Sequence, residues 1–440
     1  MIETVRVLLL STYDLGRQPF GLASPAAWLR GAGHEVTAID LARDPLRVGN
    51  ADVAALYLSM HTAMRLSLKV IEKIRAESPA VRICCYGLYA PLNEELLRAA
   101  GVEAIFGGEF EKSLVDWVGG GAKTGMTRVS MERLRFVTPD RTGLPVLERY
   151  AQVMGAGKAR TVGYTEASRG CKHLCRHCPI VPVYNGAFRV VQRDVVLEDI
   201  RRQVAAGARH ITFGDPDFFN GVGHALKIVQ EFHAEFPGVS YDVTIKVEHL
   251  LKHRASLETL RRTGCLFVTS AVESVDDGIL TKFAKGHTRA DFYEAVSMMR
   301  AAGLPLSPTF VTFTPWTTRE GYCDLLRCLV ELDLVESVAP IQLAIRLLLP
   351  AGSRLLDLPE VRAIAGPFDA EALAHRWRNP DVAMDELCLE LQKTIAREEK
   401  RGQSRTEIFR QVWEMANGRP LEVPLMGRAT VPYLNEPWYC

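Results

Sequence analysis

Three cysteine thiols lie within eight residues of the chain, in the pattern Cys171-x-x-x-Cys175-x-x-Cys178. Three thiolates can hold three irons of a cubane iron–sulfur cluster and leave the fourth iron open to a small chelating molecule, whereas an electron-transfer cluster normally takes four thiolates. A zinc site with His173 or His177 as fourth ligand is the alternative. The spacing therefore predicts a metal centre of one of these two kinds.

The cysteines directly follow the first of six apolar runs that alternate with helical patterns. These runs occupy residues 161–166, 210–213, 241–245, 267–272, 306–313 and 341–347. Six strand–helix units predict a partial (βα)6 barrel over residues 156–355 rather than a closed eight-stranded one. Active sites on such barrels lie where the strands end, which is where Cys171 follows the first strand.

An earlier series of apolar runs predicts a second α/β unit over residues 1–120. The runs are at 5–10, 35–39, 53–58, 81–86 and 103–106, with helix-length segments between them. This alternation is typical of a doubly wound, Rossmann-like parallel sheet. Ser24 and Pro25 predict a helix N-cap and first helical position, and Gly33 predicts the end of that helix.

The remaining segments have weaker patterns. Residues 121–155 contain Gly and Pro without sustained periodicity, and we predict a linker there. Residues 356–440 predict a helical region, with helices at 384–399 and 406–417 and an extended, proline-rich tail from 421 to 440.

Composition is that of a globular enzyme. The chain has 440 residues, 48% hydrophobic and 24% charged, with a net charge of +1. This balance gives no electrostatic footprint for nucleic acid or anionic lipid. Without an apolar run of about 18 residues or a signal-peptide pattern, the chain is predicted to be cytoplasmic and not membrane-bound. We assign the cysteines of the apolar segments to the core: Cys84, Cys85, Cys265, Cys323, Cys328 and Cys388.

The cysteine motif at the end of the first barrel strand resembles the radical S-adenosylmethionine (SAM) superfamily, over roughly residues 160–355. The resemblance implies a [4Fe–4S] cluster on Cys171, Cys175 and Cys178, with SAM on the open iron and reductive cleavage of SAM to an adenosyl radical. It also implies an electron donor such as flavodoxin or ferredoxin, and a small-molecule or peptide substrate. An iron–sulfur redox or metal sensor is the non-enzyme alternative.

The same resemblance implies SAM contacts at the ends of later strands. Asp215 and Asp217 suit the ammonium group of SAM by charge-assisted hydrogen bonding, although they could instead cap the following helix. The predicted SAM-binding residues are Gly214, Asp215, Asp217, Lys246, Glu248, Glu273 and Ser274.

Residues 1–120 resemble the cobalamin-binding domain found in one branch of this superfamily. The similar segments are 16–21, after the first strand, and 107–111, near the end of the domain. The signature Asp-x-His-x-x-Gly, which supplies a histidine to cobalt, is missing, and His61 stands alone. Cobalamin is therefore a possible cofactor, and a cobalamin-dependent radical SAM methyltransferase is an alternative to a cobalamin-free enzyme.

The last nine residues, Pro-Tyr-Leu-Asn-Glu-Pro-Trp-Tyr-Cys440, resemble a radical SAM family named for a Cys-Sec-Ala-Glu-Pro or Cys-Cys-Ala-Glu-Pro tail. In that family the residue after the first tail cysteine can be selenocysteine, whose codon is also read as stop. The resemblance implies that a UGA codon follows Cys440 and that Cys440 acts in catalysis. The simpler alternative is that Cys440 ends an extended arm packed on the barrel.

Overall fold

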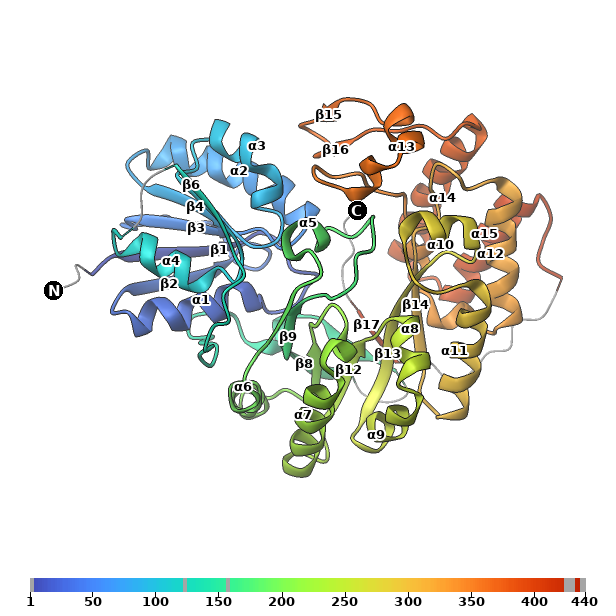
Figure 1. The fold of residues 1–440 in the computed structure, drawn as a ribbon, viewed down its shortest axis with the longest axis horizontal. Coiled ribbons are helices and arrows are strands. Elements are labelled where there is room, and N and C mark those ends of the chain that lie inside the picture. Colours follow the sequence, from blue (N-terminus) through green and yellow to red (C-terminus); the bar gives the residue numbers. More distant parts are fainter. Residues whose placement is uncertain (1–3, 122–124, 156–158, 423–431, 436–440) are drawn as a thin grey trace.

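The computed structural model describes residues 4–121, 125–155, 159–422 and 432–435. Two parallel sheets and a helical region follow one another along the chain (Figure 1). The first sheet is at one end of the molecule, the second lies in the middle, and the long helices near the carboxyl end pack beside the second. In the described ranges, no helix is long and apolar enough to cross a membrane.

The first sheet confirms the predicted doubly wound architecture. Its six parallel strands have the order β2-β1-β3-β4-β5-β6. Leu8 and Leu10 of β1 pack with α2 and α3, while Val7 and Leu9 face α1 and α4, so helices cover both faces. The elements are β1 (Arg6–Ser11), α1 (Phe20–Gly31), β2 (Glu35–Asp40), β3 (Val53–Tyr57), α2 (His61–Glu77), β4 (Arg82–Tyr86), η1 (Pro91–Asn93), α3 (Glu94–Ala99), β5 (Ala104–Gly108), α4 (Glu111–Val118) and β6 (Met126–Ser130).

The predicted start of α1 at Ser24 and Pro25 is wrong, because the helix begins at Phe20 and includes both residues. Pro25 has no N–H to offer the carbonyl one turn earlier. The Tyr86 hydroxyl donates to that carbonyl, on Gly21, at 2.8 Å. The predicted helix end is correct, since Gly33 follows the last turn with a φ of 89°.

The predicted linker, residues 121–155, contains regular structure. Its β6 pairs with β5 and adds an edge strand to the first sheet, and β7 (Gln152–Met154) belongs to the second sheet. Between them lies η2 (Leu147–Arg149). An edge strand is paired on one side only and needs little burial, as the 43% exposure of Val129 shows. The sequence of β6 therefore has no apolar run to reveal it.

The second sheet has the order β14-β13-β12-β11-β8-β7-β17. Five parallel strands form the predicted partial barrel, and β7 and β17 are antiparallel additions at one edge. The elements are β8 (Arg160–Thr165), α6 (Arg193–Ala205), β11 (His210–Phe213), η3 (Phe218–Gly221), α7 (Val222–Glu235), β12 (Ser240–Thr244), α8 (Val247–Lys252), η4 (Arg254–Ser256), α9 (Leu257–Arg262), β13 (Cys265–Glu273), α10 (Asp277–Phe283), α11 (Arg289–Ala301), β14 (Leu306–Phe310) and α12 (Arg319–Glu331).

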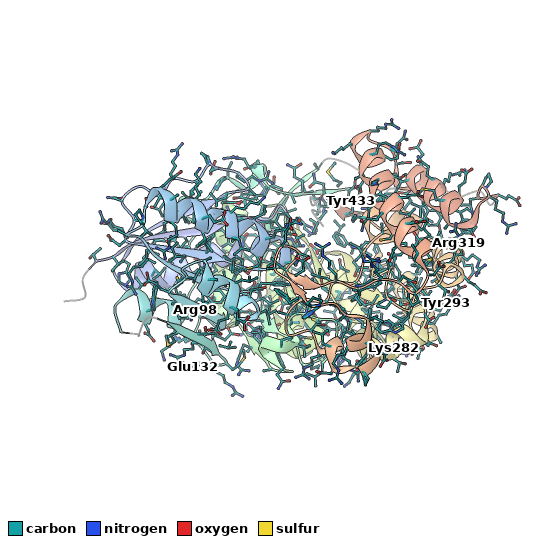
Figure 2. All side chains as sticks on the ribbon, turned by 90° about the horizontal axis from the view of Figure 1, so that it is seen from above. Arg98, Glu132, Lys282, Tyr293, Arg319 and Tyr433 are labelled. Carbon is teal, nitrogen blue, oxygen red and sulfur yellow. The ribbon has the colours of Figure 1, made fainter. Side chains whose placement is uncertain are left out.

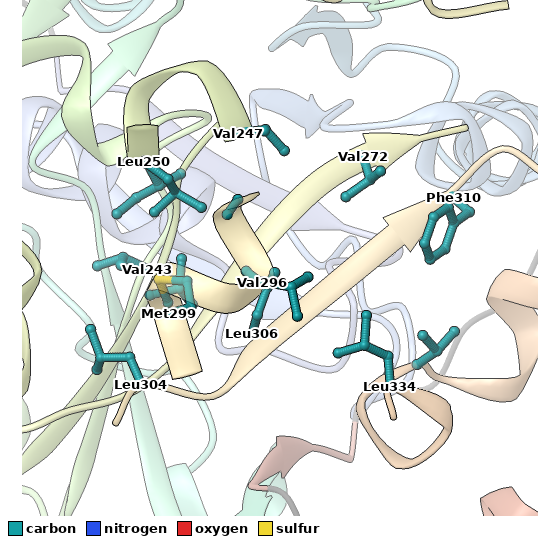
Figure 3. Close-up of a cluster of buried hydrophobic side chains, with 14 of the residues drawn as sticks. Val243, Val247, Leu250, Val272, Val296, Met299, Leu304, Leu306, Phe310 and Leu334 are labelled. Atoms are coloured by element: carbon teal, nitrogen blue, oxygen red, sulfur yellow. The ribbon is translucent and has the colours of Figure 1, made fainter. Parts of the chain in front are cut away.

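The barrel core lies between these strands and the helices that follow them. Val243 of β12 and Leu306 of β14 pack with Val296 and Met299 of α11 and with Leu250 of α8 (Figure 3). All five side chains are at most 4% exposed. The packing fixes the strand ends that carry the candidate site.

The predicted sixth barrel strand, residues 341–347, is reduced to one parallel bridge between Phe313 and Arg346. Residues Pro340–Leu343 form a 3-10 turn, η6, instead. The Phe310 N–H of β14 donates to the side chain of Gln342 at 2.9 Å rather than to a backbone carbonyl. The Gln342 side chain thus takes the hydrogen bond that a sixth strand would have accepted from β14.

The helices predicted near the carboxyl end are confirmed as α14 (Val382–Lys400) and α15 (Arg405–Asn417). In the predicted tail, β17 (Tyr433–Leu434) pairs antiparallel with β7, and the guanidinium of Arg405 lies 4.2 Å from the ring centroid of Tyr433. Figure 2 shows Tyr433 far from Arg98 and Glu132 of the first unit. The other short elements are η5 (Val335–Ser337), η7 (Arg354–Asp357), α13 (Pro359–Ile364), β15 (Phe368–Asp369) and β16 (Ala374–His375).

Candidate active site

The cysteine loop leaves the barrel after β8 and is closed by a short hairpin. Strand β9 (Ser168–Gly170) precedes Cys171 and pairs antiparallel with β10 (Phe188–Val190), and α5 (Val181–Tyr184) lies between them. Gly170 has a φ of 70°, and a Cβ on it would lie 2.3 Å from the Tyr184 ring. The tight approach at Gly170 therefore requires glycine.

The three thiols of the loop are shielded from solvent to different degrees. Cys171 and Cys175 are buried and Cys178 is partly buried. Burial raises the pKa of Cys171, and it raises the pKa of Cys178 to about 12. Thiols in such surroundings stay protonated at neutral pH unless a metal cation takes the proton's place. The donor set, three thiols in one closed loop, fits a cubane cluster with one open iron.

His177 of this loop contacts the end of β13. Its Nε2 lies 3.1 Å from Glu273 Oε1, and the Lys285 ammonium lies 3.4 Å from the same oxygen. Burial alone would raise the pKa of Glu273, but Lys285 and His177 lower it to about 2. Glu273 also has a φ of 69°, beside a register shift in β13. A non-glycine residue in this conformation is uncommon and such residues cluster at functional sites.

His173, the other loop histidine, faces the end of β11. Its Nε2 lies 3.4 Å from Asp217 Oδ2, and His249 Nδ1 of α8 lies 2.6 Å from the same oxygen. Burial would raise the pKa of Asp217, but the two imidazoles lower it to about 2. Both loop histidines thus contact carboxylates, which disfavours the alternative of a zinc site made of the three cysteines and one histidine.

Asp215 and Asp217 both have partners within the protein. Asp215 accepts from Ala167 N at 2.9 Å and from Ser168 Oγ at 2.5 Å, and burial raises its pKa to about 7. Asp217 accepts from Phe219 N, which caps η3. Asp217 therefore caps the following turn through its Oδ1, as the capping alternative expects. Asp215 instead holds the start of the cysteine loop.

The other predicted SAM contacts lie at neighbouring strand ends. A Cβ on Gly214 would lie 1.7 Å from the Tyr164 hydroxyl, so packing against Tyr164 requires this glycine. The Lys246 ammonium is 3.5 Å from Glu248 Oε2, and Glu248 is the more exposed partner. Ser274 is 9% exposed, and its hydroxyl accepts from a backbone N–H two residues later.

Sequence reasoning missed two residues that complete these contacts, His249 and Lys285. A signal for His249 exists, because it directly follows Glu248 at the end of the third barrel strand. Lys285 follows a helix and reaches Glu273 only through the fold. The predicted residue Cys440 lies outside the described residues.

A buried ionic network joins the cysteine loop to the first sheet. The Arg169 guanidinium lies 2.7 Å from both Glu111 and Glu166 and 3.4 Å from Glu109. One cation thus faces three carboxylates. Burial raises the pKa of Glu109 to about 7 although Arg169 opposes that change.

The region where cobalamin is expected lies at the strand ends of the first sheet, against the barrel. A pocket of about 220 Å³ lies there, between Tyr57 and Phe110 of the first unit and Tyr164 of the barrel. His61 is tied elsewhere, since its Nε2 lies 2.7 Å from the carbonyl of Ala372. Among the described residues, those that line this pocket include no histidine.

Comparison with known proteins identifies the barrel. Residues 165–327 match the family model described as the radical SAM superfamily. Among curated proteins, the chain is 25% identical over 182 residues to the ribosomal protein uS12 methylthiotransferase RimO of Parabacteroides distasonis, covering 38% of this chain and 41% of that protein. It is 24% identical to the hopanoid C-3 methylase of Methylococcus capsulatus, over 34% of this chain and 29% of that protein. The chain thus matches less than half the length of either relative.

Two solved structures share the fold over most of the chain. The cobalamin-dependent SAM radical enzyme OxsB, with aqua-cobalamin and SAM bound, has a TM-score of 0.70 at 14% identity, covering 89% of this chain and 66% of that one. The radical SAM methyltransferase TsrM from Kitasatospora setae, with cobalamin and a [4Fe–4S] cluster bound, has a TM-score of 0.59 at 16% identity, covering 75% and 71%. The comparisons thus show that residues 165–327 resemble the radical SAM superfamily, and that the fold of the chain resembles the folds of these two enzymes.

Proposed function

We propose that this protein is a radical SAM enzyme in which Cys171, Cys175 and Cys178 hold a [4Fe–4S] cluster. One observation carries the proposal: three thiols, two of them buried and one partly buried, lie in one loop that a hairpin closes at the end of the first barrel strand. When bound, such a cluster supplies the electron that cleaves SAM reductively to an adenosyl radical. The substrate class is a small molecule or a peptide, and the electron donor is a flavodoxin or ferredoxin.

The protein's own residues orient the loop. Asp215 holds the backbone before Cys171 through Ala167 and Ser168, and Glu273 holds His177 between Cys175 and Cys178. Each contact joins the loop to the end of a different barrel strand. A loop fixed at several points keeps its ligands in place without a reorganisation cost at each turnover.

SAM is proposed to lie against the strand ends that carry Gly214, Lys246, Glu248, Glu273 and Ser274. Of the carboxylates there, Asp215, Asp217 and Glu273 are at most 8% exposed and have protein partners. The Glu248 side chain is 42% exposed, so we assign the SAM ammonium to Glu248. We therefore propose Glu248, in place of Asp215 and Asp217, as the residue that contacts the ammonium group of SAM.

The test is anaerobic reconstitution with iron, sulfide, SAM and dithionite, followed by chromatography for 5′-deoxyadenosine. The wild-type chain is expected to form it, and Cys175→Ala is expected to lose both the product and the visible cluster absorbance. Cys388→Ala is the matched control, because Cys388 is equally buried but lies on α14, among the core residues. A wild-type chain that assembles the cluster without cleaving SAM would favour the sensor alternative.

A second candidate function, cobalamin-dependent methyl transfer, is supported by the likeness in fold to OxsB and TsrM. The lack of a histidine among the described residues that line the pocket at the first sheet opposes it. We infer at most weak cobalamin binding without an axial imidazole. Anaerobic purification with added hydroxocobalamin tests this inference: a corrin absorption spectrum in stoichiometric amount would overturn it. The proposed role of Cys440 in a selenocysteine-containing tail stays a prediction.

A further inference from the structure

Three metal-ligating atoms converge beside the cysteine loop. They are Nε2 of His173, Oδ2 of Asp217 and Nδ1 of His249, and all lie within 4.8 Å of one another. The residues come from three separate parts of the barrel: the cysteine loop, the segment after β11 and helix α8. Folding, rather than local sequence, brings them together.

Each of the three atoms is buried and has no hydrogen bond of acceptable geometry. Asp217 is fully buried and His249 is 1% exposed. His249 Nδ1 and Asp217 Oδ2 are only 2.6 Å apart, yet the imidazole is not aligned to donate to that oxygen. Attraction between the imidazoles and the carboxylate offsets part of the cost of burying polar atoms without aligned hydrogen bonds, which is about 1–3 kcal/mol each. One cation bound by all three atoms would satisfy them together.

We propose that His173, Asp217 and His249 bind one divalent transition-metal ion, with zinc as the first candidate, at a site separate from the three cysteines. Two imidazoles and one carboxylate form a ligand set that suits zinc and leaves a fourth position open. In a tetrahedral site with bonds of about 2.1 Å, neighbouring ligand atoms are about 3.4 Å apart. The His173 to Asp217 distance of 3.4 Å matches this value, and the 2.6 Å distance to His249 requires a small outward movement.

The surroundings of His173 support the same assignment. Its other ring nitrogen, Nδ1, lies 3.6 Å from Glu248 Oε2. Histidines that bind a metal usually direct their second nitrogen to a carboxylate or carbonyl, which fixes the ring. Glu248 is thus a positioning residue for His173 through its Oε2, and we keep its Oε1 for the SAM ammonium assigned above. The bound ion would tie the cysteine loop to the second and third strand ends, whether or not SAM cleavage occurs.

The test measures zinc in the full chain, purified anaerobically with its iron–sulfur cluster and dialysed with one equivalent of zinc sulfate against a weak chelator. Elemental analysis is expected to give one zinc per chain. Zinc X-ray absorption is expected to show a shell of nitrogen and oxygen at about 2.0–2.1 Å. No retained zinc, or a sulfur shell at about 2.3 Å from capture by the cysteines, would overturn the proposal.

Two variants and a control decide which residues hold the ion. His249→Ala and Asp217→Asn are each expected to weaken zinc binding at least about 100-fold while the iron content stays at the wild-type level. His253→Ala is the control, because the His253 ring is 5.6 Å from that of His249 but is not one of the three ligands. It is expected to retain zinc.

Wild-type zinc affinity in either ligand variant would contradict the site. Circular dichroism checks folding, and Asp217→Asn, which keeps the size of the side chain, decides the question where His249→Ala fails to fold. These measurements read metal content and coordination rather than SAM cleavage. Failure of the zinc site and failure of the proposed function are therefore distinguishable.

Discussion

Two buried carboxylates in this protein have pKa values shifted in opposite directions. Glu273 faces Lys285 and His177, and its pKa falls to about 2 although burial opposes the change. Glu109 shares Arg169 with two other carboxylates, and its pKa rises to about 7. Burial favours a raised pKa at both groups, and the nearby cations reverse that effect at Glu273 but not at Glu109.

At the residue scale, we predict that Lys285→Met lowers the free energy of unfolding by about 3–5 kcal/mol, because it leaves the buried Glu273 carboxylate without its ammonium partner. Urea denaturation followed by circular dichroism measures the change. The double variant Lys285→Met with Glu273→Gln is expected to recover part of the loss. A double variant no more stable than Lys285→Met would show that the lysine acts through packing instead.

Glu109 gives a pH-dependent prediction. Its folded-state pKa of about 7 exceeds the ordinary 4.5, so the folded protein binds this proton more tightly than the unfolded chain does. The resulting stability is complete below about pH 4.5 and is lost as the pH rises through 7; it amounts to at most about 3 kcal/mol. Glu109→Gln is expected to flatten the stability profile between pH 5 and 8, measured by melting temperature. An unchanged slope would contradict this assignment.

At the scale of elements, the hairpin of β9 and β10 positions the whole cysteine loop. The chain leaves β9 at Gly170, which has a φ of 70°. A Cβ at this position would meet the Tyr184 ring and the carbonyl of Ala187. The hairpin is short, with three residues in each strand. Few backbone hydrogen bonds hold it, so side-chain fit at this glycine carries much of its stability.

We predict that Gly170→Ala lowers the free energy of unfolding by about 2–4 kcal/mol and reduces cluster loading, because the new methyl group meets Tyr184 in a conformation that alanine rarely adopts. Iron content and urea denaturation measure the two effects. Gly402→Ala is the control: its φ is 73°, but nothing lies within 4 Å of the added Cβ. It is expected to cost about 1 kcal/mol with full loading. If both variants lost the same amount of stability, the positive φ alone would explain the loss, and the predicted clash with Tyr184 would be wrong.

The sequence predicts those elements that have a strong apolar period and misses those held by a few specific contacts. The strand at residues 210–213 and the helices α14 and α15 are predicted correctly because each has a face that must be buried. Strand β6 is missed because an edge strand needs little burial, and the sixth barrel strand fails because Gln342 takes its hydrogen bond. The cysteine loop is visible locally, but its contacts with Asp217 and Glu273 depend on folding.

At the scale of the whole molecule, Arg169 is the main buried ionic link between the cysteine loop and the first sheet in the described residues. It contacts Glu109 and Glu111 from one unit and Glu166 from the other. The guanidinium also lies over three aromatic rings, Phe20, Phe110 and Phe136. The loop that carries the proposed cluster is thereby fixed to the first α/β unit.

We predict that Arg169→Leu lowers the free energy of unfolding by about 3–5 kcal/mol, since it leaves three buried carboxylates without a cation. Limited proteolysis is expected to cut the variant between the two sheets faster than the wild type. Arg149→Leu is the control, because the Arg149 pair with Asp44 is exposed and is worth less than about 1 kcal/mol. Equal protease resistance of the two variants would argue against a link between the units.

The pairing of β17 with β7 has a consequence for biosynthesis. Asn435 contacts Gln152 across a separation of 283 residues, so the edge of the second sheet is completed only when nearly the whole described chain exists. At about 5–20 residues per second, the ribosome needs roughly 15–60 s to make the intervening segment. During that time β7 presents an unpaired edge to neighbouring chains on the same message. Mutations in β17 are therefore expected to increase aggregation of the nascent chain before they measurably lower the stability of the folded protein.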